Sequence, residues 1–240
     1  MTAVLITGAN RGIGLELARQ YAANKADVIG CCRAPETAEA LKELVSSSGG
    51  RVQIMRLDVA EEASIASLKD MLGDQPIDII INNAGIVGPE NQSADGIDAE
   101  GWMITLRVNA LAPILIALAL RDNLKHGSEK KLVAISSGLG STSTTTSSGL
   151  APIRYAYCAS KAALNNGMHA LSRDWATDGI LVGILAPGYV RTDMGGAAAA
   201  SHPSSISPEE SASALIRRIA ELTPATTGTF QNHRGETIAW

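Results

Sequence analysis

Aromatic residues, cysteines and clustered positive charges are all scarce in this sequence. Aromatic side chains make up 3% of the 240 residues, so aliphatic side chains must fill the core. There are three cysteines, and two of them, Cys31 and Cys32, are adjacent. An odd number at this spacing gives no disulfide framework and no metal motif. We therefore expect no metal site and a reducing, cytoplasmic location.

Basic clusters and long apolar runs are also missing. The formal net charge is -4, which argues against a nucleic acid or an anionic membrane surface as a partner. The most apolar stretch, residues 110–120, is too short to span a bilayer and contains Pro113. The N-terminal residues are typical of a buried strand and not of a signal segment. We therefore expect no membrane partner.

The sequence does contain a regular alternation of apolar and amphipathic stretches. The apolar runs are β-branched or aliphatic, as expected for strands covered on both faces, and span residues 4–7, 27–32, 52–58, 77–82, 132–136, 181–186 and 228–231. The amphipathic stretches predict helices over residues 13–24, 36–47, 61–72, 102–124, 155–178 and 208–222. This order predicts an α/β fold, a doubly wound parallel sheet of about seven strands with helices on both faces, in a single domain over residues 1–240.

Two loops rich in small residues follow the ends of predicted strands. Residues 138–152 are rich in serine, threonine and glycine, and residues 194–207 hold a glycine pair and four alanines. Ligands of such sheets bind at the carboxyl ends of the strands. We expect either two flexible connections or two segments that flank a substrate cleft.

A glycine-rich turn joins the first predicted strand to the first predicted helix. It contains Gly8, Gly12 and Gly14, separated by Asn10, Arg11 and Ile13. Glycine there permits a tight turn and a close approach to a pyrophosphate, and the following helix offers free N–H groups. The spacing G-x-x-x-G-x-G differs from the common G-x-G-x-x-G fingerprint. A merely tight turn is the alternative.

Tyr157 and Lys161 carry the strongest chemical signal. Their spacing of four residues places both side chains on one face of the predicted helix, one turn apart. A phenol has a pKa near 10, so it needs a neighbouring cation to exchange protons at neutral pH. Tyr155 lacks such a partner, because Ala159 stands four residues later.

These features, in this order, resemble the short-chain dehydrogenases/reductases over nearly the whole chain. The resemblance rests on the glycine turn, on Asn82-Asn83-Ala84-Gly85 after the fourth strand, on Ser137 and on the Tyr157/Lys161 pair. The segments 155–157, 162–165 and 235–240 are similar to the C-factor and sniffer group of small carbonyl reductases. The resemblance implies a Rossmann fold and hydride transfer with a nicotinamide cofactor.

The family's catalytic residues match four positions. The resemblance implies that Tyr157 acts as general acid and base, that Ser137 donates a second hydrogen bond to the substrate oxygen, and that Lys161 lowers the pKa of the phenol and holds the nicotinamide ribose. Ser136 is the alternative serine. Asn109 would continue a proton path through water, although an amide among apolar neighbours is as often a structural group.

The second predicted strand ends without the acid that an NAD-preferring site places there. Cys32 occupies that position, Arg33 follows it, and Arg11 lies in the glycine turn. Two guanidinium groups suit a 2′-phosphate, so we expect NADP(H), with NAD(H) as the second choice. Two solvated surface arginines are the alternative. Asp58, with Val59 beside it, resembles the family's adenine-contacting acid, or else it is a helix cap.

The resemblance places two further segments against the cofactor. Asn83, Ala84 and Gly85 would steady the sheet beside it. The segment after the sixth strand would close over the nicotinamide through Pro187, Gly188, Val190 and Thr192. The alternative is that each segment is a plain turn.

We therefore expect an NADPH-dependent carbonyl reductase or alcohol dehydrogenase acting on a small ketone, aldehyde or secondary alcohol. One alternative is an NADP(H)-binding signalling or sensing protein of the C-factor type. Another is a reductase of ketoacyl groups on a carrier protein. Family members commonly pair through the helices predicted at 102–124 and 155–178, so we expect a homodimer or homotetramer.

Overall fold

The computed structural model describes residues 1–145 and 154–240. Seven parallel strands form one sheet in the order β3-β2-β1-β4-β7-β8-β9. Their bounds are Ala3–Thr7 (β1), Asp27–Cys32 (β2), Val52–Arg56 (β3), Ile79–Asn82 (β4), Lys131–Ile135 (β7), Leu181–Ala186 (β8) and Phe230–Asn232 (β9). The predicted doubly wound Rossmann-type α/β fold is confirmed. The strand order reverses direction between β1 and β4, and such sheets bind their ligands at that switch point.

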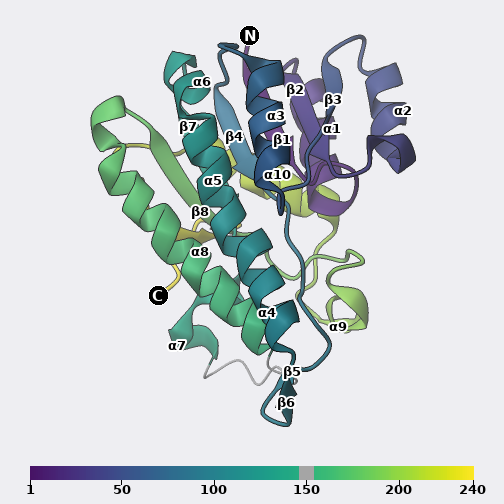
Figure 1. Ribbon diagram of the computed structural model, residues 1–240, viewed down its shortest axis with the longest axis vertical. Coiled ribbons are helices and arrows are strands. Elements are labelled where there is room, and N and C mark those ends of the chain that lie inside the picture. The colour runs from purple at the N-terminus through teal and green to yellow at the C-terminus, as the bar shows by residue number, and fades with distance from the viewer. Residues whose placement is uncertain (146–153) are drawn as a thin grey trace.

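Helices cover both faces of the sheet (Figure 1). On one face, apolar side chains of α3 (Glu62–Leu72), α5 (Ala112–Ala119) and α8 (Tyr155–Asp174) pack with the sheet into one core cluster. On the other face, α1 (Gly12–Ala23), α2 (Glu39–Ser47) and α10 (Pro208–Ala220) form the second cluster. The sheet is buried between them, which explains why its strands are apolar at nearly every position.

Several short elements complete the chain. Two antiparallel strands, β5 (Gln92–Ser93) and β6 (Gly96–Ile97), form a small hairpin before α4. The remaining helices are α4 (Ala99–Leu106), α6 (Arg121–His126), α7 (Thr142–Thr145) and α9 (Gly196–Ser201). Figure 1 shows α4 and α5 running beside α8. The hairpin and α9 lie in segments that the sequence predicted as irregular, and residues 146–152 of the predicted loop 138–152 lie outside the described residues.

The helix predicted over 102–124 is divided into α4, a π-helical turn at Arg107–Leu111, α5 and α6. Pro113 has no N–H to donate to the carbonyl of Asn109, so a regular α-helical ladder cannot continue there. The N–H of Ala112 instead bonds the carbonyl of Arg107, five residues back. The interruption is a bulge at the position where the sequence placed Asn109.

Several predicted element bounds differ from the structure by one to four residues. The third strand ends at Arg56 and not at residue 58, the fourth begins at Ile79 and not at 77, and the helix predicted to residue 178 ends at Asp174 before a 3-10 turn. These are end effects, where periodicity in the sequence is weakest.

The prediction that no apolar run is long enough to span a membrane is wrong by length and composition. The continuous helical run Ala99–Ala119 is long and apolar enough to do so. Less than half of it is buried within this chain, and the core helix of a globular protein passes the same test. The sequence did not indicate this run because its apolar residues are spread over α4, the π turn and α5, with Glu100 and Arg107 among them.

Candidate active site

The glycine turn lies at the carboxyl end of β1, at the switch point of the sheet. Gly8 and Gly12 have positive φ angles of 67° and 55°, a conformation that favours glycine. A Cβ on Gly14 would overlap the carbonyl oxygen of Gly8, so the turn is tight enough to exclude any side chain there. Arg11, the N-cap of α1, gives its helix no side-chain cap. The first N–H groups of α1 are therefore available to an anion.

The Asn-Asn-Ala-Gly segment after β4 is tied directly to this turn. The hydroxyl oxygen of Thr7 accepts from the N–H groups of Asn83 and Ala84, each at 3.0 Å. The side-chain amide of Asn83 donates to the carbonyls of Thr7 at 3.0 Å and Gly8 at 3.1 Å. These four bonds hold the two segments in one register, with Ala84 and Gly85 half-buried beside the turn.

The predicted proton-transfer residues meet at the carboxyl end of β7. Tyr157 and Lys161 lie on the first two turns of α8, with the Lys161 ammonium 5.9 Å from the centre of the phenol ring. The ammonium donates to the carbonyl of Ile135 at 2.9 Å. Ser137 hydrogen-bonds the phenol of Tyr157. Ser136 is turned away and donates to the side chain of Asn165, so the geometry favours Ser137 over the alternative serine.

Burial controls the titration of both groups. It raises the pKa of the Tyr157 phenol, while the hydrogen bond with Ser137 opposes that rise. The expected lowering of this pKa by Lys161 is not what the surroundings of the phenol produce, because desolvation is the largest influence. Burial also lowers the pKa of Lys161 to about 8. The phenol is therefore kept protonated at neutral pH, as a proton donor must be.

Asn109 lies in the π turn, with its side chain fully enclosed. Its amide N–H groups donate to the carbonyl of Ile86 at 2.8 Å and to the hydroxyl of Ser160 at 3.0 Å, and its oxygen accepts from the N–H of Ile86 at 2.8 Å. Both N–H groups are used, so the side chain serves as a structural tie. The geometry thus favours a structural role for the side-chain amide. The backbone carbonyl of Asn109 receives no helical hydrogen bond from Pro113, which has no N–H.

The two predicted phosphate-binding arginines differ in their surroundings. At the end of β2, Cys32 is buried and Arg33 is exposed. Arg11 is also exposed, but it pairs with Asp193 at 2.9 Å. Asp58 accepts from the N–H of Ala60 at 3.0 Å in the turn before α3, but it is not the cap of that helix, whose N-cap is Glu61. Val59 beside it is half-buried.

The segment after β8 lies opposite the glycine turn. Gly188 has a φ of 89°, and a Cβ there would lie 2.9 Å from the ring of His233. The methyl group of Thr192 lies 3.4 Å from a Cβ placed on Gly12, so the segment approaches the turn closely. Val190 forms a bridge with Ile206, which links this segment to the end of the predicted loop 194–207.

Two buried amides at the site were missed by the sequence analysis. Asn165 joins Ser136 to the carbonyl of Gly140. Its position four residues after Lys161, on the same face of α8, is a signal that periodicity could have used. Gln92, in the β5–β6 hairpin, accepts a hydrogen bond from the backbone N–H of Tyr157. No local pattern in the sequence predicts this contact. Among residues 1–145 and 154–240, no group of three or more potential metal ligands gathers.

Comparison with known proteins identifies the family. A short chain dehydrogenase family model matches residues 2–202. The C-signal protein of Myxococcus xanthus is 33% identical over 165 residues, which cover 69% of this chain and 93% of the relative. The NADPH-bound carbonyl reductase from chicken fatty liver superposes with a TM-score of 0.91 at 30% identity, covering 100% of this chain and 99% of the other. The carbonyl reductase Sniffer of D. melanogaster has a TM-score of 0.87 at 30% identity, with 100% of both chains covered. The resemblance to the C-factor and sniffer group is thus confirmed.

Proposed function

The chain belongs to the short-chain dehydrogenase family, and on that basis we propose that it is an NADPH-dependent carbonyl reductase. The observation that carries the proposal is the meeting of Ser137, Tyr157 and Lys161 beside the glycine turn, at the switch point of the sheet. The substrate class is a small ketone or aldehyde, or the secondary alcohol in the reverse direction.

The residues present fit a dinucleotide phosphate. The positive φ angles of Gly8 and Gly12 and the uncapped start of α1 form a cradle for a pyrophosphate. The adenosine end of the cofactor would be lined by Asn83, Ala84, Gly85, Asp58 and Val59. The nicotinamide end would be lined by Pro187, Gly188, Val190 and Thr192. The buried Cys32, in place of an acid, and the exposed Arg11 and Arg33 support NADP(H) over NAD(H).

The chemistry that the cofactor supplies when bound is delivery of a hydride to the carbonyl carbon. The phenol of Tyr157 gives its proton to the substrate oxygen as negative charge develops there. Ser137 donates a second hydrogen bond to the same oxygen, and two donors fixed in advance stabilise that charge. Lys161, whose pKa of about 8 leaves it largely protonated at neutral pH, holds positive charge beside the phenolate that results.

Asn109 contributes through its backbone. Its side chain is occupied by Ile86 and Ser160, but its carbonyl has no donor from Pro113. We place at this carbonyl a water that returns a proton toward Tyr157 through Lys161. The interruption of the helical ladder at Arg107–Leu111 supports this proposal.

Two alternatives differ in their support. The similarity to the C-signal protein favours a second candidate, a signalling protein in which NADP(H) binding is the function. A reductase of carrier-bound ketoacyl groups would need a free basic patch. Arg218 pairs with Glu221, which offsets its charge, whereas Arg191 hydrogen-bonds the neutral Ser205 and keeps its charge.

The test is consumption of NADPH with a panel of aldehydes, ketones and diketones, repeated with NADH. We expect turnover with several carbonyls and a preference for NADPH. Equal rates with NADH would contradict the cofactor proposal. Normal NADPH binding without turnover, in the wild type and in Tyr157→Phe alike, would replace the enzyme proposal by the signalling one.

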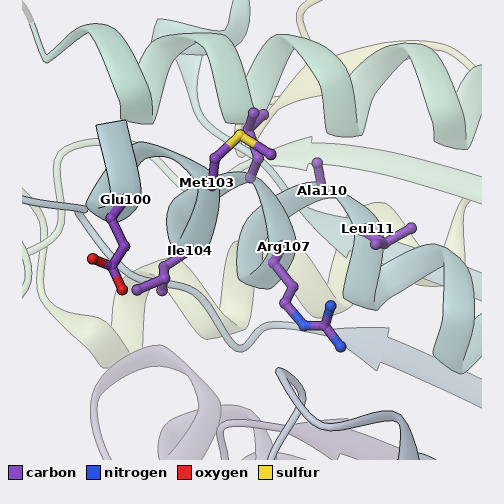
Figure 2. A pocket seen from close by; sticks show the side chains of 7 residues that line it. Glu100, Met103, Ile104, Arg107, Ala110 and Leu111 are labelled. Carbon is purple, nitrogen blue, oxygen red and sulfur yellow. The ribbon is translucent and has the colours of Figure 1, made fainter. Parts of the chain in front are cut away.

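We also propose that a second copy of this chain covers the outer face of α4 and α5. An apolar groove lies on α4 and the π turn, lined by Met103, Ile104 and Leu111 with Glu100 and Arg107 at its sides (Figure 2). Ile104, Leu111 and Leu118 recur every seven residues, and each is about half exposed. Such a stripe suits pairing with another helix.

Light scattering tests this proposal, and we expect a dimer or a tetramer. Ile104→Glu should dissociate it, whereas Met71→Glu, at an exposed apolar site on α3, should not. A monomeric wild type would contradict the proposal.

The cysteines support a reducing, cytoplasmic setting for this enzyme. All three are free thiols, and Cys31 and Cys32 are buried on opposite faces of β2. Burial raises the pKa of both thiols, which keeps them protonated and unreactive.

A further inference from the structure

Gln92 is a buried polar residue in an exposed hairpin. The residues on both sides of β5, Asn91 and Ala94, are exposed, whereas Gln92 is 4% accessible. A buried side-chain amide destabilises a fold unless its N–H and carbonyl groups find partners. Its position therefore requires specific partners, and their identity indicates its role.

The amide of Gln92 joins two segments at the candidate active site. Its oxygen accepts from the backbone N–H of Tyr157 at 3.1 Å. Its N–H groups donate to the carbonyls of Val87 at 3.1 Å and Pro89 at 2.6 Å. One side chain thus links the start of α8 to the segment that follows Gly85.

The bond to Tyr157 supplies a missing helix cap. The first N–H groups of an α-helix have no acceptor within the helix. Arg154, at the N-cap of α8, offers no side-chain acceptor. Gln92, 65 residues away in the sequence, provides one at the third residue of the helix, which is Tyr157 itself.

Ser160 and Asn109 hold the backbone of Tyr157 on its carbonyl side. The hydroxyl of Ser160 donates to the carbonyl of Tyr157 at 2.8 Å and accepts from Asn109 at 3.0 Å. Asn109 in turn bonds both backbone groups of Ile86. The backbone of Tyr157 is therefore tied through its N–H and through its carbonyl, and both ties lead to residues 86–89.

We propose that Gln92 is a positioning residue that fixes the phenol of Tyr157 relative to Ser137 and Lys161. The inference rests on the proposed function, because it concerns the proton donor of that reaction. Without the amide, the start of α8 loses its link to residues 87–89, and the phenol is free to move from its serine partner. Misplacement of a reacting group by about 1 Å can cost on the order of a hundredfold in rate.

Gln92→Met tests the inference, since methionine keeps the length and apolar bulk but makes none of the three bonds. We expect kcat for carbonyl reduction to fall by about tenfold or more, with the Kd of NADPH unchanged. The bond with Ser137 lowers the pKa of the phenol, so its weakening should move the alkaline limb of the kcat–pH profile to higher pH.

Asn123→Leu is the matched control. Asn123 is also a fully buried amide, and it donates to the carbonyls of Gly73 and Gln75, each at 2.8 Å, near the amino end of β4. The loss of its bonds should lower the melting temperature and leave kcat and the pH limb unchanged. If Gln92→Met does not fold, Gln92→Asn keeps the amide but is one methylene too short to link both segments, and the same limb shift is expected.

The outcomes separate this inference from the proposed function. If Gln92→Met behaves as Asn123→Leu does, with lower melting temperature but unchanged kcat and pH limb, then Gln92 is only a helix cap and the inference is overturned. A wild type that binds NADPH but reduces no carbonyl overturns the proposed function instead. In that case ultraviolet titration of Tyr157, isolated by subtracting Tyr157→Phe, still decides: an unchanged titration in Gln92→Met overturns the positioning role.

Discussion

The proposed cofactor cradle and the proposed proton-transfer site share one edge of the sheet but are held by different kinds of contact. The cradle is built from neighbouring turns, in which Thr7 and Asn83 exchange bonds with backbone groups one strand away. The proton-transfer site depends on two buried amides from distant segments. Gln92 hydrogen-bonds the backbone of Tyr157 directly, and Asn109 does so through Ser160. Substitution of a glycine such as Gly14 would disrupt the first arrangement, because a Cβ there overlaps the backbone. The second arrangement depends on the hydrogen bonds of a few side-chain amides.

The strongest way to separate the two regions is to remove the phenol alone. Tyr157→Phe should lower kcat by about 10²–10⁴-fold, the usual contribution of a general acid, and leave the Kd of NADPH unchanged. Tyr155→Phe, two positions earlier on the same turn of α8, serves as the control and should keep its activity. Equal losses in the two variants would show that the phenol of Tyr157 has no special part in the reaction.

The opposite change damages the cradle and spares the chemistry. Gly14→Ala places a Cβ against the carbonyl of Gly8, and such overpacking costs about 1–3 kcal/mol. We expect NADPH to bind at least tenfold more weakly by fluorescence titration, with kcat at saturating cofactor nearly retained. Gly138→Ala, at a glycine with open space around its Cα, should bind NADPH as the wild type does. An unchanged Kd in Gly14→Ala would mean that the turn does not hold the pyrophosphate.

A finer division lies within the cradle, between the two arginines. Arg33→Gln should weaken NADPH binding about tenfold, which corresponds to about 1.4 kcal/mol, and leave NADH binding unchanged. Arg11→Gln should have the smaller effect, because the Arg11 guanidinium is shared with Asp193. Calorimetric titration of each variant with both cofactors measures this; a parallel loss for NADH would place the arginines away from the 2′-phosphate.

The smallest effect concerns the buried ammonium of the proton-transfer site. The pKa of Lys161 is lowered to about 8 by burial, so between about pH 8 and its unfolded value near 10.4 the unfolded chain binds the extra proton. The free energy of unfolding should therefore rise with pH in that window, by at most about 1.4 kcal/mol per pH unit. Lys161→Met should lack this rise.

Subtracting the variant from the wild type removes the opposing contribution of the buried thiols, whose raised pKa values cost stability as the pH rises. Urea denaturation at pH 7.5, 8.5 and 9.5 gives the difference. A difference that stays flat over this window would indicate that Lys161 is solvated and titrates normally.

The same contrast explains what the sequence could predict. The order of strands and helices along the chain, the helices on both faces of the sheet, the glycine turn and the Tyr157/Lys161 pair follow from local periodicity and short motifs. Ser137 follows only from the resemblance to the family. The π turn can be predicted only in part, because Pro113 indicates a lost hydrogen bond but not how the helix adjusts to it. Gln92 was missed because its three partners lie in segments that only the tertiary fold brings together.

The central proposal is that the phenol of Tyr157 donates its proton to the substrate oxygen. The most direct test is a single-turnover measurement of carbonyl reduction from preformed enzyme–NADPH complex, as a function of pH and in H₂O and D₂O. If Tyr157 is the proton donor, the rate falls at alkaline pH as one group deprotonates and shows a solvent isotope effect, and Tyr157→Phe loses both. A wild-type rate that is independent of pH and of solvent isotope would contradict it.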